Sequence, residues 1–191
     1  MDFEVSGTCC IWAALICLTL PLQWVLSAVA AAIIHEACHI LAVFLAGGRI
    51  NSIKIGTAGA VMDASELPEF RQILCILAGP VGSFSLVLAA GQMPKLAFCG
   101  LVHGLYNLLP IYPLDGGRLL ACIAKKHFSP KSAHRICEWT KWTVMFVLFI
   151  FVLWMIRQWK TGIMPLLILL VMVYKTSSGK IPCKEGDLGV Q

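Results

Sequence analysis

Two histidines and a glutamate lie close together in a stretch of the chain that has few other ionisable side chains. Between residues 5 and 48, the ionisable side chains other than cysteines are His35, Glu36 and His39. Imidazoles at positions i and i+4 lie on one face of a helix, where both can reach a single metal ion. A glutamate beside the first histidine can accept a proton from a metal-bound water. This H-E-x-x-H pattern predicts a zinc site with Glu36 as its general base.

The composition of the chain is typical of an integral membrane protein. The 191 residues are 59% hydrophobic and only 13% charged, whereas soluble domains average about 25% charged residues. Ionisable residues are costly at membrane depth, so three of them within one apolar span indicate a functional site. The net charge of +5 comes mostly from one basic loop. We therefore expect the lipid bilayer and a membrane protein substrate as partners, and no nucleic acid.

The long apolar stretches predict an all-α polytopic membrane protein, since a transmembrane helix needs about 20 apolar residues. We expect about six spans, with five as the alternative, near residues 8–22, 24–46, 72–93, 96–109, 139–157 and 161–174. Residues 49–62 favour a small β-hairpin at the membrane surface, with an ordinary polar connection as the alternative. The expected organisation is one membrane domain over residues 1–178, followed by a short tail over residues 179–191.

Basic residues concentrate in the loop between the predicted fourth and fifth spans. Basic residues in short loops favour the cytoplasmic side of the membrane. With six spans, this orientation puts both termini in the cytoplasm of a multi-pass cell-membrane protein. It also places the histidine site towards the cytoplasmic leaflet.

A third metal ligand is expected because zinc hydrolases commonly use three protein ligands and leave a fourth position for water. Asp115 is the strongest candidate, since it follows Pro110 and Pro113 and precedes a Gly-Gly pair. The glycines allow close backbone approach, and the prolines free carbonyl groups that a continuous helix would use. Irregular backbone at membrane depth is tolerated only within protein or beside a watery cavity. Such a cavity is what an intramembrane hydrolase requires.

Two motifs carry the residues discussed so far, H-E-x-x-H at residues 35–39 and N-x-x-P-x-x-P-L-D-G-G at residues 107–117. Taken together, they resemble those of the site-2 protease family of intramembrane zinc metalloproteases. The Ala-Gly-Pro of the third span, at residues 78–80, also fits the three-helix catalytic core of that family. The resemblance covers about residues 24–125. It is closest to the compact branch that includes the stage IV sporulation protease.

The resemblance implies His35, His39 and Asp115 as the ligands of one zinc ion. It further implies Glu36 as the general acid and base, and Asn107 as a contact for the substrate backbone or the developing oxyanion. The expected substrate is a membrane-tethered protein such as a sigma-factor precursor or an anti-sigma factor. Regulatory membrane proteins are further expected partners. We expect neither the CBS domain of the sporulation branch nor a PDZ domain, which leaves the means of regulation open.

Two roles stay open at this point. A non-proteolytic membrane protein that keeps the site for metal binding or a chaperone-like task is the alternative function, although metal binding alone needs no base at Glu36. His103 lies four residues before Asn107, and we favour a structural hydrogen bond over a substrate contact for it. We also hypothesise that residues 49–62 pair with an extended substrate as an added strand.

Overall fold

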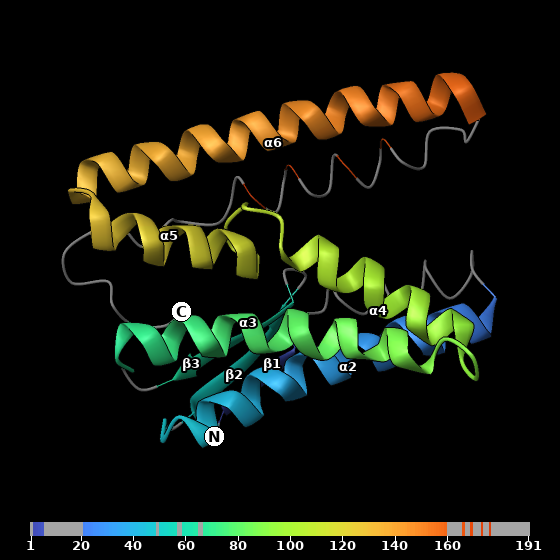
Figure 1. Cartoon of the computed structure of the whole chain (residues 1–191), viewed down its shortest axis with the longest axis horizontal. Coiled ribbons are helices and arrows are strands. Elements are labelled where there is room, and N and C mark those ends of the chain that lie inside the picture. Colours follow the sequence, from blue (N-terminus) through green and yellow to red (C-terminus); the bar gives the residue numbers. More distant parts are fainter. Residues whose placement is uncertain are drawn as a thin grey trace. The chain divides into compact units, whose positions relative to one another are not determined.

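The computed structural model of the chain describes residues 2–5, 21–48, 50–56, 59–64 and 67–159, together with four single positions between 166 and 176. Within it the chain forms two compact units (Figure 1). The first unit extends to Leu108, and the second begins at Leu109.

The first unit contains three long helices that each pack against the other two (Figure 1). They are α2 (Leu22–Leu45), α3 (Glu69–Ser85) and α4 (Pro94–Asn107), and the short 3₁₀ helix η1 (Leu86–Ala89) connects α3 to α4. This arrangement matches the predicted three-helix core. Its helices carry both histidines of the motif, Asn107 and the Ala-Gly-Pro segment.

The side chains of α2 divide into a buried stripe and an apolar exposed surface. Its buried residues recur every four positions, at Ala31, His35, His39 and Val43. Large hydrophobic side chains cover the exposed surface, among them Leu26, Val29, Ile33, Ile40, Leu41 and Phe44. Such a surface is compatible with lipid tails, so the histidines point into the protein while the rest of the helix suits a bilayer.

Small residues bring α4 close to α3. A Cβ atom added at Gly100 would lie 2.7 Å from the backbone oxygen of Ser83, and one added at Gly104 would lie 2.8 Å from the Phe84 ring. Helices in membranes commonly associate through such small residues, because lipid offers no hydrophobic driving force between them. The close approach brings α4 up to the α3 segment that contacts the histidines.

A three-stranded sheet completes the described part of the first unit. Its strands are β1 (Asp2–Val5), β2 (Ile50–Gly56) and β3 (Gly59–Ala64), in the order β1-β2-β3. Strands β2 and β3 pair antiparallel, and β1 pairs parallel with β2. The sequence analysis did not anticipate β1. Because β2 has a neighbour on each side, an added substrate strand could reach this sheet only at the outer edge of β1 or β3, among the strands described.

The second unit contains helices α5 (Asp115–His127) and α6 (Pro130–Trp159), which pack against each other. Their contact is built from the small buried residues Ala121, Ala124, Ala133 and Cys137. The sequence analysis treated this basic segment as a loop, and the structure shows two helices instead. Helix α5 has Asp115 in its first turn and three basic residues in its last turn, so both charges favour the helix dipole.

Three described helices are long and apolar enough to cross a membrane: Leu22–Leu45, Glu69–Ala89 and Pro130–Gln158. They correspond to the predicted second, third and fifth spans. The predicted fourth span is helix α4, whose 14 residues extend only about 21 Å, less than the thickness of a bilayer core. The predicted first and sixth spans lie almost wholly outside the described residues, so six crossings stay a prediction.

Candidate metal centre

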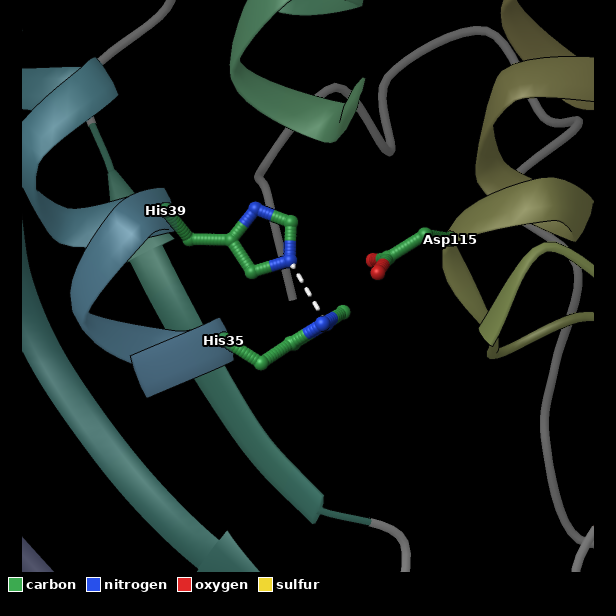
Figure 2. Close-up of side chains that lie close together, drawn as sticks. All are labelled: His35, His39 and Asp115. Atoms are coloured by element: carbon green, nitrogen blue, oxygen red, sulfur yellow. Dashed lines mark hydrogen bonds between the residues drawn. The ribbon is translucent and has the colours of Figure 1, made fainter. Parts of the chain in front are cut away.

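The two histidines of the motif meet inside the first unit. Both are buried, with 2% of His35 and 8% of His39 exposed. Their Nε2 atoms lie 3.1 Å apart (Figure 2), and the rings meet edge to face, with their centroids 4.8 Å apart. One helical turn of α2 therefore directs two imidazole nitrogens to the same point, as the i, i+4 spacing predicts.

Helix α3 holds the other nitrogen of each ring. Nδ1 of His35 lies 2.9 Å from the Ser83 hydroxyl oxygen, and Nδ1 of His39 lies 2.7 Å from the backbone oxygen of Cys75. Hydrogen bonds of this kind fix the orientation of a metal-binding histidine, because they occupy the nitrogen that does not bind the metal. Both Nε2 atoms are thereby turned towards the same side.

A glycine of α3 leaves room beside the two Nε2 atoms. A Cβ atom added at Gly79 would lie 2.2 Å from Nε2 of His39 and 2.7 Å from Nε2 of His35. The sequence analysis placed this glycine in the three-helix core and did not anticipate its position beside the histidines. A signal was present, since Cys75, Gly79 and Ser83 are spaced four residues apart and lie on one face of α3.

Three other residues singled out from the sequence lie on the same helices. Glu36 follows His35 in α2 and is half-buried. The half-buried His103 of α4 contacts His35, with ring centroids 4.8 Å apart and an angle of 84° between the planes. Asn107, the last residue of α4, donates a hydrogen bond from Nδ2 to the backbone oxygen of His103 at 3.1 Å. His103 therefore extends the histidine cluster, and the role of Asn107 towards a substrate stays a prediction.

In the second unit, Asp115 is the first residue of α5, and only 6% of it is exposed. The preceding loop folds back over this helix start, and a Cβ atom at Gly117 would lie 2.3 Å from the backbone nitrogen of Tyr112. Burial raises the pKa of the Tyr112 phenol above its usual value, and Arg118 partly offsets this. The phenol therefore stays protonated at neutral pH.

In the first unit, His35 and His39 are buried imidazoles whose Nε2 atoms could bind one metal ion, and in the second unit Asp115 is a buried carboxylate of the kind that serves as a further ligand (Figure 2). Two imidazoles and one carboxylate are a donor set that zinc hydrolases use while keeping a fourth position open. Gly79 allows both rings to lie close against α3, because a single added carbon there would already crowd both Nε2 atoms. Within the described residues, the donors therefore fit zinc.

Comparison with protein families agrees with this geometry. The family model described as Peptidase M50B-like matches residues 8–106, just over half of the chain. The model described as Peptidase family M50 matches residues 88–152. The chain therefore belongs to the M50B-like peptidases, which are site-2 proteases, and the resemblance drawn from its two motifs is confirmed.

Individual relatives agree with this family. Stage IV sporulation protein FB of Bacillus subtilis is 32% identical over an alignment of 119 residues that covers 54% of this chain and 41% of that protein. A zinc metalloprotease of Methanocaldococcus jannaschii is 27% identical over an alignment of 110 residues that covers 50% of this chain and 32% of that protein. The matches thus span less than half the length of either relative.

A solved structure shares the fold. The site-2 protease from Methanocaldococcus jannaschii superposes with a TM-score of 0.67 at 20% sequence identity, covering 94% of this chain and 91% of that one. Together with the three apolar helices, this similarity indicates a membrane protein with the site-2 protease fold.

Proposed function

We propose that this chain is an intramembrane zinc metalloprotease that hydrolyses a peptide bond in or near a transmembrane segment of a membrane-tethered protein. The observation that carries the proposal is the buried histidine pair of α2, whose Nε2 atoms lie 3.1 Å apart in a helix apolar enough to cross a membrane. A metal site there, with a glutamate next to one ligand, suits hydrolysis at membrane depth. Membership of the M50B-like peptidases supports the same activity.

In this proposal His35, His39 and Asp115 are the protein ligands of one zinc ion. When bound, zinc acidifies a water molecule and polarises the scissile carbonyl group. The Glu36 carboxylate accepts the proton of the attacking water and later delivers it to the leaving amine. Its half-buried position on α2, directly after a ligand, is compatible with both transfers.

The substrate must present an extended backbone, because a helix keeps its carbonyl groups hydrogen-bonded and shielded by side chains. Asn107 is proposed to hold the substrate backbone or the oxyanion at the end of α4. The outer edge of β3 is proposed to pair with the unwound substrate segment as an added strand. This restricts the hypothesis that residues 49–62 pair with the substrate to one strand edge. A sigma-factor precursor or an anti-sigma factor is the substrate class proposed, since a sporulation protein is among the relatives.

The proposed setting is a multi-pass domain of the cell membrane. Both termini are proposed to lie in the cytoplasm, with the site towards the cytoplasmic leaflet, because the α5–α6 segment carries the largest cluster of basic residues in the chain. Regulatory membrane proteins are proposed as further partners.

Co-expression of the chain with candidate membrane-tethered substrates tests the activity. We expect the parent chain to produce a shortened substrate and Glu36→Gln to produce none, while both variants accumulate to the same level in the membrane. Glu69→Gln is the matched control, because Glu69 is an exposed glutamate at the start of α3. Equal product from the parent and Glu36→Gln would refute the assigned role of Glu36. Zinc binding without any cleavage would favour the non-proteolytic alternative.

A further inference from the structure

We propose that Ser83 is a positioning residue that sets His35 as a metal ligand, an inference that rests on the zinc site proposed above. Ser83 is fully buried on α3, with 0% of it exposed. Its hydroxyl oxygen lies 2.9 Å from Nδ1 of His35. The side chain does not belong to the metal-binding group, so it acts on the metal through the orientation of His35.

The two histidines differ in the kind of partner that holds Nδ1. The Cys75 backbone oxygen only accepts hydrogen bonds, so the Nδ1 of His39 that it contacts at 2.7 Å must carry a proton. A neutral His39 ring then has its lone pair on Nε2, as a metal ligand requires. A hydroxyl can either donate or accept. Ser83 can therefore keep its bond to His35 whichever nitrogen of that ring carries the proton.

Ring packing alone does not select the metal-binding nitrogen of His35. The edge-to-face contact with His103, at 4.8 Å between centroids, constrains the plane of the ring. Such a contact barely distinguishes one ring edge from the other, because both edges carry C–H and nitrogen atoms. The hydrogen bond to Ser83 does distinguish them, since it keeps Nδ1 on α3 and leaves Nε2 facing His39.

Zinc binding by the full chain in detergent tests this inference. Removing an outer partner of a metal-binding histidine typically lowers metal affinity by about 10- to 100-fold, and we expect a loss of that size for Ser83→Ala. Ser83→Thr keeps the hydroxyl and is expected to restore most of the affinity. Ser85→Ala is the matched control, because the Ser85 hydroxyl donates to the backbone oxygen of Gly82 at 2.7 Å and the contact stays within α3. It should bind zinc as the parent does.

Nitrogen-15 NMR of labelled histidines provides a readout that a purely space-filling role would not change. In the zinc-loaded parent, His35 should show a protonated Nδ1 and a metal-bound Nε2. In Ser83→Ala the His35 signals should shift or split while those of His39 stay in place. This comparison decides the question even if Ser83→Thr does not fold.

The outcomes separate the two proposals. Parent-like zinc affinity and unchanged His35 signals in Ser83→Ala would show that Ser83 only fills space, and the zinc protease proposal would survive. Failure of the parent chain itself to bind zinc would overturn the proposed function.

Discussion

Replacing Gly79 by alanine is expected to disable the metal site while adding a single carbon atom. The new Cβ would lie 2.2 Å from Nε2 of His39 and 2.7 Å from Nε2 of His35, whereas ordinary contact begins at 3.4 Å. One ring or the helix must therefore move by about 1 Å, because overlapping atoms repel steeply. Zinc–ligand distances tolerate deviations of only about 0.2 Å. The histidines cannot both keep their positions around one ion.

The size of the expected loss in zinc affinity follows from this displacement of about 1 Å. A misplacement of about 1 Å in a catalytic site can lower the rate by about 100-fold, and we expect a loss of at least that size in zinc affinity. This corresponds to about 2.7 kcal/mol of binding free energy. The strain should also lower the free energy of unfolding by about 1–3 kcal/mol, as overpacked cores do.

The assay is competition for zinc with a calibrated chelator, followed by cleavage of a co-purified substrate. Gly91→Ala is the matched control, because a Cβ at Gly91 meets no atom within 4 Å. It should retain parent-like affinity and activity. If Gly79→Ala binds zinc as tightly as Gly91→Ala and cleaves as fast, the space beside Gly79 does not border the ion and the reasoning is wrong.

Other changes test separate parts of the structure. Gly82→Ala places a Cβ 2.3 Å from the Cys38 sulfur, so it should lower the free energy of unfolding by about 1–3 kcal/mol. Adding Cys38→Ala should recover part of that loss of stability. Strictly additive losses of the two changes in a denaturant titration would contradict this contact. Gly117→Ala meets backbone atoms, 2.3 Å from the Tyr112 nitrogen, so it should reduce the yield of folded protein more than Gly82→Ala does, and equal yields would count against the loop packing. Asp115→Ala should weaken zinc binding by about 100-fold or more with the helix content unchanged, because a zinc ligand is lost. Parent-like binding by that variant would remove Asp115 from the ligand set.

The local part of the site could be predicted from the sequence, and the long-range part could not. The i, i+4 spacing fixes His35 and His39 on one helix face, so their convergence follows from helix geometry alone. The roles of Gly79 and Ser83 depend on how α3 is aligned beside α2, which no local pattern specifies. Their spacing along α3 was visible, but it is equally typical of ordinary packing between membrane helices.

The same distinction between local and long-range features explains where the fold differs from the one predicted from the sequence. Strand β1 has only four residues and pairs with β2, about fifty positions later, so no local periodicity could indicate it. The charges of the α5–α6 segment suggested a loop, although acidic and basic residues at opposite ends of α5 also favour a helix. Helix α4 was correctly placed, but its length falls short of a full crossing.

The central claim is that this chain hydrolyses peptide bonds with a zinc ion and Glu36. Its most direct test measures bound zinc and cleavage product together, for the parent and Glu36→Gln reconstituted in liposomes with a membrane-tethered substrate. We predict about one zinc ion per chain in both proteins, product from the parent alone, and loss of that product when a chelator removes the zinc. Product from Glu36→Gln at the parental rate, or from a parent chain without zinc, would contradict the account.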